Sequence, residues 1–264
     1  MLVRALRGAI ARRAFTALPA AALREAPIRA RFTARNTAEV TLADGTVTTV
    51  DTTRLRQTDD HAVWMAARAA LDATASDFSA AAFDGSPFRS RAALLEEKSS
   101  RAPGPRVDTP ATRFGAVSEP KAIREYARVS GNTVEATGLW TDGDARYGAS
   151  PDGLVVDGAT GERGLLEVKC HFFRRRNRSL PAMRTAPRGY LAQIQGQLAV
   201  CGADWCDLAC WIPRNSRGPN LRILRVFRDA EYWADIEPRL RAFSADLAVA
   251  RAALEGAPPG GHES

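Results

Sequence analysis

Two acidic residues and one lysine lie in short segments of the sequence that are typical of neighbouring β-strands. Glu167 and Lys169 are two residues apart in an apolar run, and Asp152 precedes a second such run. Side chains two apart on a strand point to the same face of a sheet, so we expect Glu167 and Lys169 to point together. A hairpin turn centred between residues 159 and 160 would place Asp152 opposite Glu167, about 5 Å away.

This arrangement has the chemistry of a metal-dependent phosphodiesterase. Two carboxylates at such a separation repel each other unless a cation lies between them, and Mg²⁺ prefers oxygen ligands of this kind. We expect Mn²⁺ to substitute for Mg²⁺, and the backbone carbonyl of Val168 to supply a third ligand. Lys169 would orient the attacking water, help to deprotonate it, or offset the charge that develops on the phosphate. The plain alternative is a solvated hairpin with an ordinary Glu–Lys pair.

The rest of the chain alternates helix and strand patterns, which predicts an α/β fold with a central mixed β-sheet flanked by helices. Alternating residues around Asp44 and Gly45 indicate a hairpin over 39–50. Asp59 has the chemistry of a helix N-cap and Gly131 that of a helix C-cap. The predicted helices cover 59–71, 86–98, 112–129 and 190–201, with a last helix carrying Trp233 to Leu247, and the predicted strands cover 139–142, 154–156, 165–170, 204–212 and 221–227.

Several further blocks of sequence occur in the order that one known family has. The blocks are Trp64 and Arg68 with Thr74-Ala75-Ser76, residues 86–98, Gly115 to Ala122, Ser150 to Leu154, Leu166 to Cys170 and Tyr190 to Gln195. With them the sequence resembles the YqaJ-type viral recombinase family, which includes phage lambda exonuclease, within the PD-(D/E)xK nucleases. The resemblance implies a restriction-endonuclease-like core and a Mg²⁺-dependent deoxyribonuclease, acting as a 5′–3′ exonuclease on duplex DNA in recombination or repair. A structure-specific endonuclease of the same superfamily and a catalytically inactive DNA-binding module are the alternatives.

The resemblance also implies roles for individual residues. Asp152 and Glu167 would be the principal metal ligands and Lys169 the catalytic lysine. Glu119 would bind the metal directly or through water. Gln193 would position water or the scissile phosphate, unless it is an ordinary surface residue of its helix. The helical spacing places Tyr190, Gln193 and Gln197 on one face of that helix.

Two further assignments follow from the resemblance less directly. Arg68 and Ser76 match residues that hold a terminal phosphate, although the spacing here is one residue longer than in lambda exonuclease. Either Asp142 or Asp144 matches a further family acid, and both could equally be turn residues.

Basic residues follow the strand that carries Glu167 and Lys169. They are Arg174, Arg175, Arg176 and Arg178. A run of charges is usually a solvated face, but beside a phosphodiesterase site it favours a clamp on the DNA backbone with salt-dependent affinity. The net charge of +7 and the pI of about 9.7 agree with a polyanionic partner. The resemblance adds a homo-trimer and a single-strand annealing protein as partners to consider.

Residues 1–35 have the composition of a basic leader. No acid precedes Glu25, and arginines are spread through alanine and leucine, which is typical of an organelle transit peptide for a mitochondrion or plastid. A basic DNA-contacting arm is the alternative reading, and a nuclear or viral setting stays open. No apolar run is long enough for a membrane span. We expect a single nuclease domain over 36–256, with an N-terminal hairpin and helices, and a disordered tail over 257–264.

Overall fold

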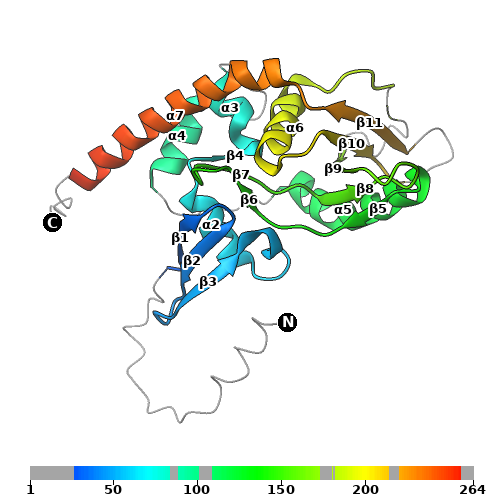
Figure 1. Cartoon of the computed structure of the whole chain (residues 1–264). Coiled ribbons are helices and arrows are strands. Elements are labelled where there is room, and N and C mark those ends of the chain that lie inside the picture. Colours follow the sequence, from blue (N-terminus) through cyan, green and yellow to red (C-terminus); the bar gives the residue numbers. More distant parts are fainter. Residues whose placement is uncertain are drawn as a thin grey trace, which may run out of the picture.

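The computed structural model describes residues 27–83, 89–100, 109–172, 180, 182–213 and 220–256. Its strands form three sheets flanked by helices, so the predicted α/β class is confirmed (Figure 1). Most of the predicted leader and the predicted tail, residues 1–26 and 257–264, lie outside the described residues. None of the described helices is long and apolar enough to cross a membrane.

The central sheet has five strands and is mixed. Its order is β11-β10-β9-β8-β5, and the strands are β5 (Thr133–Glu135), β8 (Gly153–Val156), β9 (Arg163–Cys170), β10 (Trp205–Trp211) and β11 (Leu221–Phe227). The pair β9–β10 is parallel and the other neighbours are antiparallel. Helix α6 (Arg188–Cys201) lies between β9 and β10 in the chain and thus belongs to the crossover that a parallel pair requires.

The two faces of the central sheet pack against different helices. Leu166 of β9 packs on one face with Tyr126 of α5 (Pro110–Ser130). Leu165 packs on the other face with Ile194 and Leu198 of α6. This alternation follows from the two-residue repeat of a strand, and it directs every second side chain of β9 toward α6.

A separate three-stranded sheet begins the described chain. The strands β1 (Arg29–Ala34), β2 (Thr37–Thr41) and β3 (Val47–Asp51) are consecutive and antiparallel. The predicted hairpin is confirmed, and Gly45 in its turn has a φ of +84° that favours glycine. Residues 29–34 of the predicted leader form β1, which pairs with β2, and the leader boundary at residue 35 stays a prediction. Arg29 and Arg31 lie on the exposed side of this edge strand, and Ala30 and Phe32 alternate with them as half-buried residues.

Short elements complete the fold, and several of them were not predicted. The strands β4 (Ala73–Thr74), β7 (Tyr147–Ala149) and β6 (Trp140–Thr141) form a third sheet. The helices are α2 (His61–Ala70), α3 (Phe78–Ala82), α4 (Arg91–Ser99) and α7 (Ala230–Gly256), with 3-10 turns η1 (Thr52–Arg54) and η2 (Ala75–Asp77). Figure 1 shows α7 running beside α3 and α4, with which it is in contact.

Two predicted helix starts are corrected. Asp60, and not Asp59, caps α2, because its Oδ1 accepts the N–H of Val63 while the Asp59 carboxylate pairs with Arg56. The helix predicted over 86–98 begins at Arg91, and residues 84–88 lie outside the described part of the chain.

Gly196 and Gly115 give opposite predictions for the same substitution. A Cβ added at Gly196 of α6 would lie 2.2 Å from the Phe78 ring, whereas a Cβ at Gly115 of α5 would meet nothing within 4 Å. Gly196→Ala should lower the free energy of unfolding, since overpacking costs about 1–3 kcal/mol and alanine regains at most about 1 kcal/mol in a helix. Gly115→Ala should raise it by up to about 1 kcal/mol. Urea unfolding of both variants checks this, and a stabilised Gly196→Ala would contradict the packing described.

Candidate active site

The end of the β8–β9 hairpin carries the predicted pair of acidic residues. Gly153 pairs with Leu166, and the N–H of Asp152 donates to the Leu166 carbonyl at 2.9 Å. Continuing this register by one residue places Asp152 opposite Glu167. The register predicted from a turn centred between residues 159 and 160 is therefore confirmed.

Glu167 is buried and is held from the side of α6. Lys169 Nζ lies 2.5 Å from its Oε1 and Gln193 Nε2 donates to the same oxygen at 2.9 Å. Gln197 Nε2 donates to Oε2 at 2.6 Å. Lys169 Nζ also donates to Gln193 Oε1 at 3.0 Å. Glu167 and Lys169 point together as predicted, and Gln193 is a member of the site rather than a surface residue.

The charge of Lys169 is fixed by this neighbourhood. Burial disfavours its ammonium, but the charge of Glu167 and the hydrogen bond to it outweigh burial and raise the pKa of Lys169 to about 12. Nζ also lies 5.0 Å from the centroid of the Tyr190 ring. At neutral pH the lysine is therefore a cation and a hydrogen-bond donor, so offsetting charge suits it better than removing a proton.

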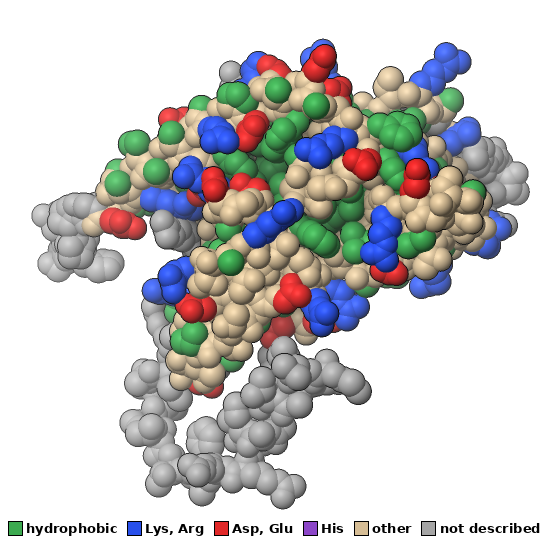
Figure 2. Space-filling view, viewed as in Figure 1, with side chains coloured by type: hydrophobic (Ala, Val, Ile, Leu, Met, Phe, Trp, Pro, Cys, Tyr) green, Lys and Arg blue, Asp and Glu red, His purple; other side chains and the backbone are tan. Residues whose placement is uncertain are grey.

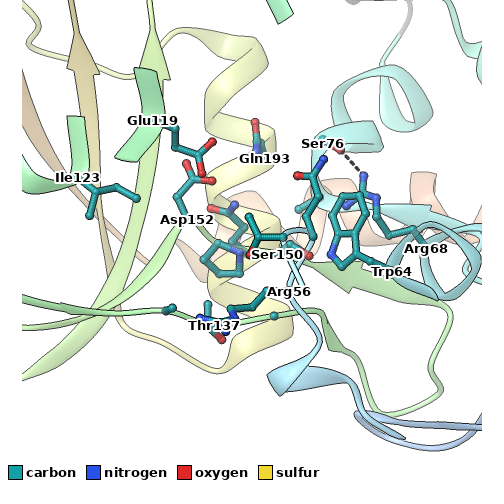
Figure 3. Close-up of a pocket in the computed structure, with 17 residues that line it drawn as sticks. Arg56, Trp64, Arg68, Ser76, Glu119, Ile123, Thr137, Ser150, Asp152 and Gln193 are labelled. Atoms are coloured by element: carbon teal, nitrogen blue, oxygen red, sulfur yellow. Dashed lines mark hydrogen bonds between the residues drawn. The ribbon is translucent and has the colours of Figure 1, made fainter. Parts of the chain in front are cut away.

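Two more carboxylates face each other on the far side of Glu167. Figure 3 shows the carboxylates of Glu119, from α5, and Asp152 directed toward one another. Burial and the charge of Glu167 raise the pKa of Glu119, and burial with both neighbouring charges raises the pKa of Asp152 well above its ordinary value. Asp152 Oδ2 accepts the N–H of Val168 at 2.6 Å. The Val168 carbonyl also points toward the Asp152 side of β9, because the N–H and C=O of one strand residue point to the same neighbouring strand.

These groups suit a divalent cation, although they do not stand ready to bind one. Across the residues that the structure describes, no three His, Cys, Asp or Glu side chains form a prepared metal site. The reason is local, since both oxygens of Glu167 are taken up by Lys169 and the α6 amides. Asp152 and Glu119 repel each other, and a cation would remove that repulsion. The available donors are carboxylates and one carbonyl, which Mg²⁺ and Mn²⁺ prefer. The ligand roles stay predictions.

A cavity of about 320 Å³ joins this acidic cluster to the predicted phosphate-binding residues (Figure 3). Glu119, Asp152 and Gln193 line it on one side, and Arg68 and Ser76 line it on another. These residues come from α2, η2, α5, α6 and the segment before β8, so the fold gathers parts of the chain that are far apart in sequence.

Arg68 is oriented by contacts on two sides. Its Nη2 donates to Thr74 Oγ1 at 2.9 Å and to Ser76 Oγ at 3.3 Å. Its guanidinium carbon lies 4.5 Å from the centroid of the Trp64 ring. A fixed guanidinium next to a hydroxyl is suited to a phosphate group. The longer spacing between Arg68 and Ser76 thus still brings both to one cavity wall.

The two candidates for a further acid lie outside this cavity. Asp142 Oδ1 accepts the backbone N–H groups of Arg146 and Tyr147 at 2.8 and 2.9 Å, so it closes the turn between β6 and β7. Asp144 lies in the same turn, beside a different cavity that β1 lines. The reading of Asp142 as a turn residue is the one that the structure favours.

The predicted DNA clamp is a run of four arginines that follows β9 in the chain. Arg174, Arg175, Arg176 and Arg178 fall within 173–179, which lies outside the described residues. Their role stays a prediction.

Comparison with known proteins decides the family. Residues 63–204, more than half of the chain, match the YqaJ-like viral recombinase domain. The chain belongs to this family. It is similar to the crystal structure of an alkaline exonuclease, LHK-Exo, from Laribacter hongkongensis, with 30% identity over 73% of this chain and 95% of that chain and a TM-score of 0.58. LHK-Exo in complex with dAMP is also similar, with 27% identity over 73% and 94% of the two chains and a TM-score of 0.57. A comparison with curated proteins gave no match.

Membership of the YqaJ-like family confirms two predictions together. The chain is a homologue of phage-type alkaline exonucleases, and its central sheet with α5 and α6 is the PD-(D/E)xK type of core. The homology indicates nuclease activity, whereas the individual site residues rest on the geometry described above.

Sequence reasoning missed two residues that shape the site. Gln197 was placed on the face of Gln193 without a role, yet it binds the buried Glu167 carboxylate. Asp77 accepts both the N–H and the hydroxyl of Thr74 at 2.9 Å and pairs with Arg89 and Lys98, next to the cavity wall formed by Arg68 and Ser76. The three-residue spacing from Thr74 to Asp77 is a capping-box pattern, which is the signal that could have found it.

We predict that Asp152→Asn stabilises the fold when divalent cations are removed. The substitution keeps an oxygen for the Val168 N–H and removes a charge that burial and two carboxylates disfavour, so the free energy of unfolding in EDTA at pH 8 should rise by about 1–3 kcal/mol. Asp142→Ala is the matched control, because it removes the acceptor of two turn N–H groups and should lower stability by about 1–2 kcal/mol. Urea unfolding measures both. A loss of stability in Asp152→Asn would contradict the described repulsion.

Asp77 gives a prediction for acid stability. Burial opposes its ionisation, but the charges of Lys98, Arg68 and Arg89 lower its pKa from 3.8 to about 2. Because the pKa of Asp77 is lower in the folded chain than in the unfolded chain, the ionised carboxylate stabilises the fold at pH values above its ordinary pKa. This contribution of roughly 2 kcal/mol should be lost as the pH falls from about 4 to 2. Asp77→Asn should show a smaller loss over that range, measured by urea unfolding. Asp246→Asn, at an exposed ion pair, should keep the wild-type acid dependence.

Proposed function

We propose that the chain is a Mg²⁺-dependent deoxyribonuclease that degrades duplex DNA as a 5′–3′ exonuclease, in recombination or repair. The observation that carries the proposal is the single cavity that joins Asp152 and Glu119 to Arg68 and Ser76, with Glu167 and Lys169 beside it. Membership of the YqaJ-like family and the similarity to LHK-Exo support it.

The side chains have different roles in the proposed phosphodiester hydrolysis. Asp152, Glu119 and Glu167 would hold the cation, together with the carbonyl of Val168. When bound, a divalent cation neutralises phosphate charge and lowers the pKa of a bound water, and Mn²⁺ can do the same. Lys169, protonated at neutral pH, would donate to a phosphate oxygen on which charge develops.

Gln193 positions the catalytic lysine in this proposal. Its amide spans Glu167 and Lys169, accepting from Nζ and donating to Oε1. These hydrogen bonds hold the Lys169 ammonium in place along the strand edge. A donor that is already oriented does not have to reorganise when charge develops in the transition state.

The opposite wall supports action at a DNA end. Arg68 and Ser76 present a guanidinium and a hydroxyl to the cavity, and a terminal phosphate offers more charge to such a pair than an internal phosphodiester. LHK-Exo has been solved with dAMP, a mononucleotide of the kind that an exonuclease releases. The structure-specific endonuclease is the alternative, because it would use the same acids and lysine and differ at this wall.

The catalytic assignment predicts that Lys169→Ala loses nuclease activity. Removing the cation beside the scissile phosphate should slow Mg²⁺-dependent degradation of a linear duplex by roughly 10²–10⁴-fold. Lys121→Ala, on the exposed side of α5, is the matched lysine control and should degrade DNA at the wild-type rate. Normal degradation by Lys169→Ala, or no Mg²⁺-dependent degradation by the wild type, would sink the assignment.

The same preparations can test the direction of degradation. Linear duplexes labelled at one end are followed over time with phosphorylated and blocked 5′ termini. Dependence on a free 5′ phosphate supports the exonuclease, and cleavage of closed circular DNA supports the endonuclease instead.

A further inference from the structure

The three-stranded sheet β1–β3 and the turn η1 precede the residues that match the family, which begin at residue 63. The loop over residues 55–60 then connects η1 to α2. This loop supplies three residues of the cavity wall, Arg56, Gln57 and Thr58. A segment outside the family match therefore helps to enclose the candidate active site.

The N-terminal segment is joined to the family domain through its backbone. Gly138 and Leu139 donate N–H groups to the carbonyls of Thr53 and Thr52 at 2.7 and 2.8 Å. A Cβ at Gly138 would lie 2.5 Å from the Thr52 carbonyl oxygen and 2.6 Å from that of Leu55, so only glycine permits this approach. These contacts fix the start of the loop over residues 55–60 against the segment that carries Gly138.

A second set of contacts fixes the sheet itself. Asn36 Oδ1 accepts the N–H of Thr141 at 2.7 Å, and the Thr141 hydroxyl accepts the N–H of Asn36 at 2.8 Å. The Arg35 guanidinium donates to the carbonyls of Thr141 and Val200 at 3.2 and 3.0 Å. The sheet is thus attached to both β6 and the end of α6, which stabilises the position of the loop beside the cavity.

Arg56 is the charged residue that this loop brings to the cavity. Figure 3 shows Arg56 and Thr137 below Asp152, with Glu119 above Asp152. Among the described residues that line the cavity, Arg56 and Arg68 are the cations. Figure 2 shows basic and acidic side chains interspersed over the face in view. Within the cavity, these two arginines are the cations available to a phosphate near the acids.

The guanidinium of Arg56 is oriented by an ion pair with Asp59 and has further hydrogen-bond donors available. Its Nε and Nη2 donate to the two oxygens of Asp59 at 2.8 and 2.9 Å. This bidentate pair uses one edge of the guanidinium, and the N–H groups of Nη1 stay available to a second acceptor. About half of the side chain is exposed, so a phosphate can reach it.

We propose that the loop 55–60 is a DNA contact contributed by the N-terminal sheet, in which Arg56 binds a backbone phosphate of the strand that enters the site. The inference rests on the proposed function, because it takes the cavity to be the place where DNA is cleaved. Asp59 pairs with one edge of the Arg56 guanidinium, and Gln57 and Thr58 complete the wall.

Equilibrium binding in EDTA separates this contact from catalysis. The full-length wild type, Arg56→Gln, Arg54→Gln and Asp59→Asn are titrated against a fluorescent, 5′-phosphorylated blunt duplex by anisotropy at several salt concentrations. Arg54 is a matched control, since it is an exposed arginine of the same segment, pairs with Asp51 at 3.5 Å and lies outside the cavity wall. Thermal unfolding of each variant reports whether the fold is intact.

Arg56→Gln should weaken binding roughly tenfold and reduce the salt dependence by about one phosphate contact. Arg54→Gln should bind within about twofold of the wild type, and so should Asp59→Asn, which keeps the arginine. The proposal is overturned if Arg56→Gln does not weaken duplex binding. It is also overturned if Arg54→Gln or Asp59→Asn weakens binding as much as Arg56→Gln does. A wild type that binds no duplex overturns it as well. A wild type that binds but shows no Mg²⁺-dependent cleavage contradicts the proposed function alone.

Discussion

Burying the carboxylate of Glu167 under α6 requires a cation and hydrogen-bond donors at close range, and much of the site follows from that requirement. Lys169 supplies the cation from the same face of β9, and Gln193 and Gln197 supply amide donors one helical turn apart on α6. Those amides reach Glu167 only because α6 packs closely on the sheet and on α3, where Gly196 lies against the Phe78 ring. The chemistry of one carboxylate thereby depends on the packing of a whole helix.

The acids on the other side of Glu167 lack such compensation. Asp152 has one backbone N–H and Glu119 faces it, so two carboxylates share a partly buried corner. A fold optimised only for stability would separate them or add a cation. Their closeness is a local cost that the rest of the fold must offset. The buried Asp207 carboxylate, by contrast, is compensated, because Arg225 makes a bidentate bond with it and the Tyr126 hydroxyl donates to it.

The parts of the site that could be predicted are those set by local chemistry. Asp157 Oδ1 accepts the N–H groups of Ala159 and Thr160, and Gly161 has a φ of +75°, so the turn alone fixes the hairpin register. The helix α3 and strand β7 escaped prediction because they are short and buried on every side, which leaves no periodic pattern. The nearness of Glu119 to Asp152 is a tertiary contact, and only the family resemblance indicated it. Strand β1 was not predicted either, because its composition of arginine and alanine also fits a basic leader.

Two parts of the chain enclose the cavity, the region that matches the family and the segment before it. The acids, the lysine and the cavity wall formed by Arg68 and Ser76 all lie within residues 63–204, which match the family. Arg56, Gln57 and Thr58 precede that region and still line the cavity. Leu55 and Val40 of this N-terminal part pack in one apolar cluster with Leu71 and Leu139 of the family region. Because apolar packing and backbone hydrogen bonds join the two parts, removing the N-terminal sheet would expose that cluster to water and open one side of the site. The nuclease core and the segment before it therefore form one structural unit, and the cavity is a property of both.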